Sequence, residues 1–578
     1  MRAKNVRNEI NTQEPIQEQI KLFKSRIIIV QAIIAVLVLL FVAYLFANQV
    51  LDVRKYRIKA QNQRRASSFV LRGDIYDRNG IKLAGDTVFY DIFARRADYV
   101  HSPEELAKIL APILKISQVN LTEKLKRKEP IISLKKQVDR QTYNQILKLR
   151  LREIPMDPKN IRVYPQGALA SHVLGYYNAD AGVSAGVEYT AREKLEHVEN
   201  KVKIERTPKG QIIYDLSTNP VEALKPQKGE SVTLTIDTAI QHICEQELNK
   251  AITKFKALRG AVIVMNPKNG EILAYAVYPF FDPNKFKDAT FLQTKNWTLT
   301  DVFPPGSTFK AITVASAMET GKINRFTKVN DTGKIKVGWW TIENYDYRKH
   351  PRPGLIDLVY LFEHSSNVGS VLVAQKMSSQ EFYDMLRKFG FGEKTGIDLP
   401  GESVGLLKPA SKWDASDHAT MSYGYGTSVT AIQMVSAMSA LANNGVRVTP
   451  HVIKYSPEEA AVRIKKTQVM SAENAKIVTD LLMTSVNRGS TLLKEGNYNI
   501  AAKTGTSRKP KENGGGYTNK LYTSAIGYLP AKDPQVLIYV IVDSAQGYEI
   551  WGNTVAVPIF REIANQVTRI MNLTPDKK

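Results

Sequence analysis

A serine and a lysine three residues apart stand at the start of a predicted helix. Ser307 and Lys310 lie in the segment PGSTFK, and FKAITVASAMETG then reads as a helix running to Gly321. Side chains at positions i and i+3 of a helix project from one face, so Lys310 can take a proton from the Ser307 hydroxyl. A serine needs such a base to act as a nucleophile, and a helix N-terminus favours negative charge developing beside it. This pair predicts acyl-transfer chemistry.

Two later segments carry groups that suit the same chemistry. EHSSNVG contains Ser365, which can relay a proton, and Asn367, whose amide can orient a peptide. In AAKTGTS, a predicted strand carries a cation and two hydroxyls beside a glycine that permits close approach of a substrate: Lys503, Thr504, Gly505 and Thr506.

Each of these short motifs also occurs elsewhere, so none is specific alone. S-x-x-K recurs at Ser133 and Lys136 in the charged run SLKKQVDR, which we interpret as a solvated surface. S-x-N recurs from Ser217 and from Ser485, and K-T-G recurs from Lys394 in GEKTGIDLPG, which runs into a proline-glycine turn. The ordered set at 307, 365 and 503, each motif in a suitable local context, carries the prediction.

The elements around these motifs predict an α+β domain over residues 229–578. ESVTLTI reads as a strand before an amphipathic helix that contains Cys244. GAVIVMNP and EILAYAVYP read as a hairpin closed by a tight primed turn at Asn269 and Gly270. NIAAKTGTS, YTSAIGYLP and VLIYVIVD read as three more strands, before a closing helix. We therefore expect a five-stranded antiparallel sheet flanked by helices.

The N-terminal part predicts a single membrane anchor. Residues 27–47 carry no charge, and as a helix they span roughly 31 Å, the thickness of a bilayer core. Lys21, Lys24 and Arg26 lie close to this segment, so we place the tail, residues 1–26, in the cytoplasm and the rest beyond the plasma membrane. Residues 48–66 follow as a basic stalk, and residues 67–228 as an irregular α+β pedestal.

Composition bounds the function further. At 578 residues the chain is too long for one ordinary core, so we expect two or three soluble units. One cysteine excludes an intramolecular disulfide and a thiolate zinc cluster, and no HExxH motif is present, so we expect no metal and no cofactor. A net charge of +24 suits anionic partners, but we expect no nucleic acid, because no binding motif accompanies the charge.

The ordered motifs are those of β-lactamases and penicillin-binding proteins. The chain resembles a class B penicillin-binding protein, and the likeness runs from the anchor to the last helix. RGDIYDRNG at 72–80, YPQGALASHVLGY at 164–176 and GVEYTAREKL at 186–195 resemble that family's non-catalytic pedestal. The resemblance implies a multidomain α+β peptidoglycan D,D-transpeptidase that binds stem peptides and β-lactams. Its implied partners are a membrane glycan polymerase and other division proteins, and the compact pedestal favours the septal type.

The resemblance also implies a role for each site residue. Ser307 attacks the penultimate D-alanine carbonyl of a stem peptide, and Lys310 takes its proton. Ser365 passes a proton to the leaving D-alanine, and Asn367 holds the donor peptide. The K-T-G segment binds the terminal carboxylate through its lysine and hydroxyls, while two backbone N–H groups form the oxyanion hole; the residues are Lys503, Thr504, Gly505 and Thr506, with the oxyanion N–H groups from Ser307 and Thr506.

Several rival functions remain open at this point. A β-lactamase uses the same three motifs but needs a device that drives water onto the acyl-enzyme, and none is identified. A catalytically idle scaffold would not need the intact serine and both lysines. GVSAG at Gly182–Gly186 matches the G-x-S-x-G elbow of α/β hydrolases, but that elbow needs a buried strand before the serine, and the preceding NADA reads as a turn.

Overall fold

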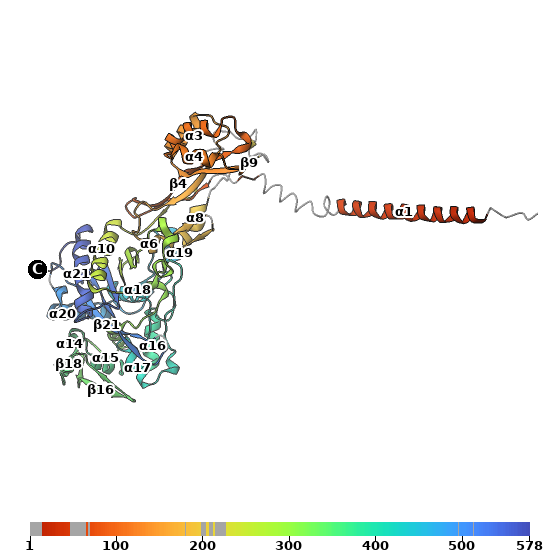
Figure 1. The fold of residues 1–578 in the computed structure, drawn as a ribbon. Coiled ribbons are helices and arrows are strands. Elements are labelled where there is room, and N and C mark those ends of the chain that lie inside the picture. The colour runs from red at the N-terminus through yellow and green to blue at the C-terminus, as the bar shows by residue number, and fades with distance from the viewer. Residues whose placement is uncertain are drawn as a thin grey trace, which may run out of the picture. The chain divides into compact units, whose positions relative to one another are not determined.

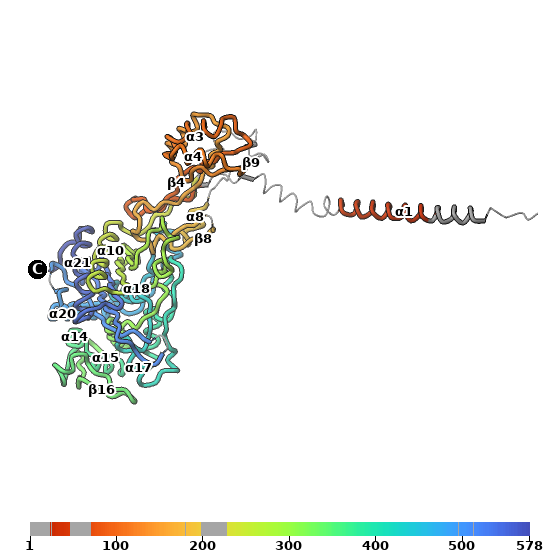
Figure 2. Tube along the Cα trace, viewed as in Figure 1, coloured from red at the N-terminus to blue at the C-terminus, as the bar shows by residue number. Residues whose placement is uncertain are grey.

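The computed structural model describes residues 14–46, 65–66, 70–179, 181–197, 204–206, 212–213, 227–489, 491–494, 496–511 and 514–577 (Figure 1). Figure 2 traces the chain in the same view. The chain forms two compact units, Met1–Val70 with Val198–Gln227, and Leu71–His197 with Lys228–Lys578. Residues 1–13 of the predicted tail, Ala47 and residues 48–64 of the predicted stalk lie outside the described residues.

The first unit contains the predicted apolar helix, which is confirmed. Helix α1 runs over Glu14–Phe46, and its part Arg26–Phe46 has a mean hydropathy of 3.0 over 21 residues. This part is long and apolar enough to cross a bilayer. Three short strands of the same unit, β1 (Arg65–Ala66), β9 (Ile204–Arg206) and β10 (Ile212–Ile213), pair antiparallel.

The N-terminal part of the second unit is built on one long strand, β4 (Lys82–Arg95), which pairs with β3, β5 and β6. Leu106, Leu110 and Leu114 of α3 pack with Ile132 and Leu134 of β5 in a separate small core. The elements are β3 (Ile75–Tyr76), α3 (Pro103–Leu114), α4 (Gln118–Leu125), β5 (Ile131–Val138), α5 (Arg140–Lys148), β6 (Met156–Val163), α6 (Ser171–Leu174), β7 (Tyr177–Asn178), β8 (Val183–Ser184), α7 (Gly186–Thr190) and α8 (Arg192–Glu196).

Three sequence landmarks of this part meet in one buried cluster of charges. Arg72, from RGDIYDRNG, and Arg162, just before YPQG, each lie 2.6 Å from a carboxylate oxygen of Glu188, from GVEY. Arg162 also lies 3.1 Å from Asp86 on β4. All four side chains are at most 5% exposed. Buried charges persist only when they are paired and hydrogen-bonded, so these residues fix how the segments 72–80 and 186–196 meet β4 and β6.

The C-terminal part of the second unit contains the predicted five-stranded antiparallel sheet, in the order β14-β13-β23-β22-β21. The strands are β13 (Arg259–Met265), β14 (Ile272–Tyr278), β21 (Ala501–Pro510), β22 (Tyr517–Leu529) and β23 (Val536–Asp543). β21, which carries the K-T-G motif, forms an edge, and its Lys503 pairs in register with Ile526 of β22. A motif on an edge strand can present its backbone to an extended peptide.

Helices cover both faces of this sheet, as expected. On β13, Val262 and Val264 pack on one side with α10 and α21, while Ala261 and Ile263 pack on the other side with α13 and α18. This alternation follows from the two-residue period of a strand. Cys244 lies fully buried on α10, where it acts as a small apolar group. The covering helices are α10 (Thr238–Phe255), α13 (Lys310–Glu319), α18 (Ala431–Ala442), α20 (Ala472–Arg488) and α21 (Gly552–Ile570) (Figure 1).

The remaining elements connect the sheet to the site. The helices and 3-10 turns are η3 (Pro283–Asp288), α11 (Phe291–Thr294), α12 (Trp297–Thr300), η4 (Gly306–Phe309), α14 (Leu358–Glu363), α15 (Asn367–Ala374), α16 (Ser379–Lys388), η5 (Ala410–Lys412), α17 (Ala415–Met421), α19 (Pro457–Arg463) and η6 (Leu492–Lys494). The strands are β12 (Val232–Thr233), β15 (Lys328–Asp331), β16 (Lys334–Val337), β17 (Trp340–Glu343), β18 (Gly354–Asp357), β19 (Val446–Val448) and β20 (Lys466–Gln468). Two further two-residue strands are β2 (Val70–Leu71) and β11 (Gln227–Lys228), and the 3-10 turn η2 covers Arg96–Asp98.

Two local predictions differ from the structure. The segment ESVTLTI, predicted as a strand, contributes only the two-residue strand β12, which pairs parallel with β3. The predicted primed turn is wrong, because only Gly270 of its two central residues has a positive φ, +85°. The backbone N–H of Gly270 bonds Asn266 O, and a register shift at Met265 absorbs the extra residue, as in a bulged hairpin loop.

Candidate active site

Ser307 lies where a tight turn becomes a helix. The 3-10 turn η4 holds Ser307, and α13 begins at Lys310, so the predicted helix starts with a 3-10 turn. Gly306 has φ +60°, a conformation that glycine adopts without strain, and its N–H bonds Gly424 O at 3.1 Å. The Ser307 hydroxyl is half-buried and forms no hydrogen bond to any residue that the structure describes. It is therefore free to meet a substrate.

The edge strand β21 packs directly against this turn. Ser507 Oγ donates to Pro304 O at 2.7 Å, and a Cβ on Gly306 would lie 3.1 Å from Ser507 Cβ. A Cβ on Gly505 would lie 2.9 Å from the Thr308 side chain and 3.2 Å from Pro305 O. The glycine of K-T-G is thus needed so that the strand can approach the serine turn.

Lys310 is fully buried one helical turn after Ser307. Its Nζ donates to Asn367 Oδ1 at 2.7 Å, to Ser365 Oγ at 3.1 Å and to the Ser365 carbonyl oxygen. Burial and the nearby charge of Lys503 lower the pKa of Lys310 well below its usual range, and Asp346 and Asp331 only partly oppose this. A lysine with a lowered pKa can be neutral at physiological pH and act as a base.

The Ser365–Asn367 segment is held in a strained loop between α14 and α15. Ser365 has φ +49°, a left-handed conformation that is uncommon for residues other than glycine. Asn367 Nδ2 donates to Glu343 O at 2.8 Å, and Ser366 Oγ caps α15 by accepting from Gly369 N at 2.7 Å. Strain of this kind persists only where the surroundings enforce it, and here the loop aims two polar groups at Lys310.

Two residues that the sequence did not single out enforce this loop. Asp331, at the end of β15, accepts from Ser366 Oγ at 2.5 Å and from Asn344 Nδ2 at 2.9 Å. Asn344, just after β17, accepts through Oδ1 from the backbone N–H of Asn367 at 2.9 Å and of Val368 at 3.0 Å. Asp331 and Asn344 are both buried. The only local signals for them are the turn sequences DTG and ENYD, which are common in loops.

Lys503 is 4% exposed on β21, and its Nζ donates to Thr504 O at 3.1 Å. Burial lowers the pKa of Lys503 to about 7. Thr504 and Thr506 are half-buried, and Thr506 Oγ1 accepts from Gly552 N at 3.0 Å. Within the described part of the chain, neither Lys310 nor Lys503 forms an ion pair with a carboxylate. The site therefore holds two buried, uncompensated lysines beside a free serine hydroxyl.

The second copies of S-x-x-K and K-T-G, and the G-x-S-x-G match, lie in local structures that do not suit catalysis. Ser133 and Lys136 are exposed on β5, where a strand sends side chains three residues apart to opposite faces. Thr395 and Gly396 donate their backbone N–H groups to Glu402, at 2.7 and 3.1 Å, in a structural turn. Ser184 ends the two-residue strand β8, after the exposed Val183, so the buried strand of a hydrolase elbow is missing at this position.

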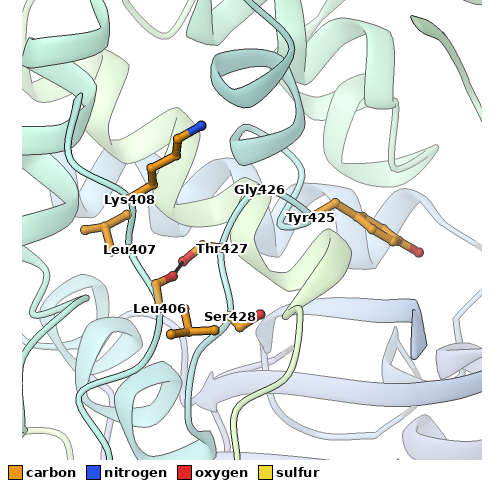
Figure 3. A pocket seen from close by; sticks show the side chains of 7 residues that line it. All are labelled: Leu406, Leu407, Lys408, Tyr425, Gly426, Thr427 and Ser428. Carbon is orange, nitrogen blue, oxygen red and sulfur yellow. Dashed lines mark hydrogen bonds between the residues drawn. The ribbon is translucent and has the colours of Figure 1, made fainter. Parts of the chain in front are cut away.

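A pocket of about 400 Å³ is lined by Leu406–Lys408 and Tyr425–Ser428, and Gly424, just before the second segment, accepts from the Gly306 N–H of the serine turn. The two segments run side by side there, and Thr427 Oγ1 donates to Leu406 O at 2.8 Å (Figure 3). Tyr425 points away from the other labelled side chains, and its hydroxyl accepts from Arg508 N at 3.0 Å on β21. The pocket wall is thereby joined to the K-T-G strand.

Comparison with known proteins agrees with this geometry. A family model described as "Penicillin binding protein transpeptidase domain" matches residues 260–565, and one described as "Penicillin-binding Protein dimerisation domain" matches residues 67–234. The chain is 32% identical to stage V sporulation protein D of Bacillus subtilis, over 88% of this chain and 79% of that protein. It is 30% identical to the peptidoglycan D,D-transpeptidase FtsI homolog of Mesostigma viride, over 93% and 94%.

A solved structure shares the fold. Penicillin-binding protein 2X from Streptococcus thermophilus superposes with a TM-score of 0.73 at 23% identity, over 89% of this chain and 83% of that one. Its fold therefore matches that of the described units, although its sequence has diverged. Taken with the two matched domains, this shows that the chain belongs to the penicillin-binding proteins, as a member that combines a dimerisation domain with a transpeptidase domain.

Proposed function

We propose that the chain is a serine-type peptidoglycan D,D-transpeptidase that cross-links stem peptides through an acyl-enzyme at Ser307. One observation carries the proposal: Lys310 is buried without an ion-pair partner, bonded to Ser365 and Asn367, and one turn from a free serine hydroxyl. This arrangement suits a neutral lysine that accepts a proton from serine.

Acylation follows from these positions. Ser307 Oγ attacks the carbonyl carbon of the penultimate D-alanine, and its proton passes to Lys310 Nζ. Oxyanion charge develops between the N–H groups of Ser307 and Thr506, and such a donor contributes about 3 kcal/mol in the transition state. The carbonyl carbon–nitrogen bond then breaks, and the proton returns through the Ser365 hydroxyl to the departing D-alanine nitrogen.

The strand β21 positions the donor peptide. Lys503, in its charged form, attracts the terminal carboxylate, and the hydroxyls of Thr504 and Thr506 complete that subsite. Asn367 binds the peptide on the other side of the serine, while Gly505 leaves space for it. The amine of a second stem peptide then attacks the acyl-enzyme, frees Ser307 and forms the cross-link. A β-lactam enters by the same route and stays bound as a persistent acyl-enzyme.

The wider setting is part of the same proposal. Helix α1 anchors the chain in the plasma membrane with the N-terminus in the cytoplasm and the catalytic part outside. Residues 67–228 form the pedestal and residues 229–578 the transpeptidase domain. A separate membrane polymerase supplies the glycan, and the enzyme serves the septum with other division proteins. Depletion in the native organism should give filaments without septa, whereas rounded cells that still divide would contradict the septal role.

Peptide turnover tests the enzymatic proposal. The full chain in detergent is given a stem pentapeptide ending in D-alanyl-D-alanine, with and without an amine acceptor, and products are identified by mass. We expect release of one D-alanine and transfer of the acyl group to the acceptor. Absence of any D-alanine release would favour the idle scaffold. Rapid hydrolysis of penicillin, with loss of its adduct within seconds, would favour a β-lactamase instead.

A further inference from the structure

Three side chains that can bind a metal ion converge behind the Ser365 loop. Asp346, His350 and His364 each offer one ligand atom, and these atoms all lie within 4.8 Å of one another. Asp346 and His350 belong to the loop between β17 and β18, where the backbone N–H of His350 bonds Asp346 O at 2.9 Å. This bond sets the two side chains four residues apart on one side of a helical turn. His364 directly follows α14 and precedes Ser365.

The spacing is close to that of a tetrahedral site. Bonds of about 2.0–2.1 Å to zinc place neighbouring ligand atoms about 3.3 Å apart. Asp346 Oδ2 and His364 Nδ1 are already 3.3 Å apart. His350 is exposed, so its ring can turn toward the other two without displacing packed side chains, and the rings of His350 and His364 are 5.3 Å apart at 84°.

The ring of His364 is held in place for this role. Tyr360 stacks on it with ring centroids 4.0 Å apart and an interplanar angle of 14°. Asp346 is only 9% exposed at its side chain and His364 27%. A ligand that is oriented by its neighbours loses less freedom when a metal binds, and such outer contacts commonly change metal affinity by about 10–100-fold.

We propose that Asp346, His350 and His364 bind one divalent transition-metal ion, with zinc as the best match, in a three-ligand site whose fourth position is open to water. Two imidazoles and one carboxylate form a ligand set that zinc accepts and that calcium or magnesium, which prefer oxygen, do not. Arg348 and Lys349 lie in the same loop but are exposed to solvent, which screens their repulsion of a cation.

The bound ion would link two segments that the transpeptidase site needs. It would cross-link the β17–β18 loop, which begins beside Asn344, to the end of α14, next to Ser365. The metal would not contact the reacting atoms; it would stabilise the positions of the β17–β18 loop and the end of α14 relative to each other. This inference goes beyond the proposed function, and metal binding can be measured whether or not the chain transfers acyl groups. The sequence shows no metal motif because His364 stands 14 residues after His350.

Cobalt titration tests the site. The full chain in detergent is freed of metal with a chelator, and Co²⁺ is added while visible absorption is recorded, with Zn²⁺ then added in competition. We expect one equivalent of Co²⁺ with d–d bands, displaced by Zn²⁺. His350→Ala and Asp346→Asn should each weaken binding by about 100-fold or more, beyond the usual loss of an outer contact. The matched control His242→Ala removes an exposed histidine on α10 and should bind like the unaltered chain.

Each variant is first checked for cooperative thermal unfolding, so that a loss of binding is read only from folded protein. Stoichiometric binding that survives in both His350→Ala and Asp346→Asn would overturn the assignment. Failure of the unaltered folded chain to bind Co²⁺ or Zn²⁺ at micromolar concentration would also overturn it, even if peptide cross-linking is intact. Loss of peptide cross-linking with metal binding intact would reject the proposed reaction and leave the metal site standing.

Discussion

The pedestal and the proposed active site both bury positive charge, but only the pedestal pairs it with carboxylates. Arg162 lies 2.6 Å from Glu188 and 3.1 Å from Asp86, and all three are nearly inaccessible to solvent. Lys310 and Lys503 are buried to a similar degree, yet no described carboxylate pairs with either. Removal of a charge from water costs free energy, which ion pairs offset for Arg162 but not for Lys310 or Lys503.

The pKa shifts follow from this difference. Burial alone would lower the pKa of Arg162, but Glu188 and Asp86 outweigh it and the pKa is raised. Burial lowers the pKa of Lys503 to about 7, and burial together with Lys503 lowers that of Lys310. Compensated charges keep their protons and hold segments together, whereas burial without an ion-pair partner makes both lysines release their protons at lower pH than an exposed lysine does. Buried Arg162 therefore stabilises the pedestal through ion pairs, whereas the similarly buried Lys310 and Lys503 have lowered pKa values of the kind that proton transfer requires.

Removal of the proposed base, Lys310, should have the largest effect. Lys310→Ala should slow acylation by fluorescent penicillin about 10²- to 10⁴-fold, because the serine then lacks its proton acceptor. Thermal unfolding should remain cooperative, since no ion pair is broken. Lys136→Ala, in the exposed S-x-x-K copy on β5, is the matched control and should acylate normally. Near-normal acylation of folded Lys310→Ala would place the base elsewhere.

Removal of Arg162 from the buried ion-pair cluster of the pedestal should lower stability and leave the acylation rate nearly unchanged. Arg162→Met leaves the Glu188 and Asp86 carboxylates short of a partner, and such a loss costs about 3–5 kcal/mol of stability. The midpoint of thermal unfolding measures this effect. The acylation rate of the folded protein should change less than twofold. The exposed pair of Arg192 with Glu196 offers a control, and Arg192→Ala should alter stability by at most about 0.5 kcal/mol. A large fall in the acylation rate of folded Arg162→Met would contradict a purely structural role for the pedestal cluster.

Asp331→Asn tests a buried carboxylate that both supports the Ser365 loop and influences the pKa of Lys310. Asp331 holds Ser366 at 2.5 Å, so loss of its charge should slow acylation about tenfold. Asp331 also raises the pKa of Lys310, so the neutral variant lowers that pKa further. In the proposed mechanism neutral Lys310 accepts the proton, so the rising limb of the acylation rate should move to lower pH. The exposed Asp384→Asn is the control; an unmoved limb in Asp331→Asn would reduce Asp331 to a packing role.

Glu245→Gln should give the smallest effect. Burial raises the pKa of Glu245 to about 7, and its side chain accepts from Ala170 N at 2.8 Å. The folded chain therefore keeps a proton that the unfolded chain releases, so this group's contribution to stability falls as pH rises from the ordinary carboxyl range to about 7. Glutamine does not titrate, and the drop in melting temperature between pH 5 and 7.5 should shrink by about 2 °C. Exposed Glu473→Gln should leave that drop unchanged, and an equal drop in both variants would contradict the assignment.

Much of the fold was predictable because its signals are local. Strands β13, β14 and β23 are runs of mainly apolar residues, and Ser307 and Lys310 share one helical turn, so composition and spacing identify them. The supports of the site were not predictable. Asp331 and Asn344 reach Ser366 and Asn367 from strands of four residues, too short for a period, and through contacts that only the folded chain makes. The primed turn failed because Asn-Gly also suits a bulged loop.

Mapping the penicillin adduct tests the central claim most directly. The full chain is exposed to penicillin, its intact mass is measured, and the adduct is located after proteolysis. We predict a single, persistent adduct on the peptide that contains Ser307, absent in Ser307→Ala and retained in Ser133→Ala and Ser184→Ala. An adduct on another residue, or labelling that survives Ser307→Ala in folded protein, would contradict the account.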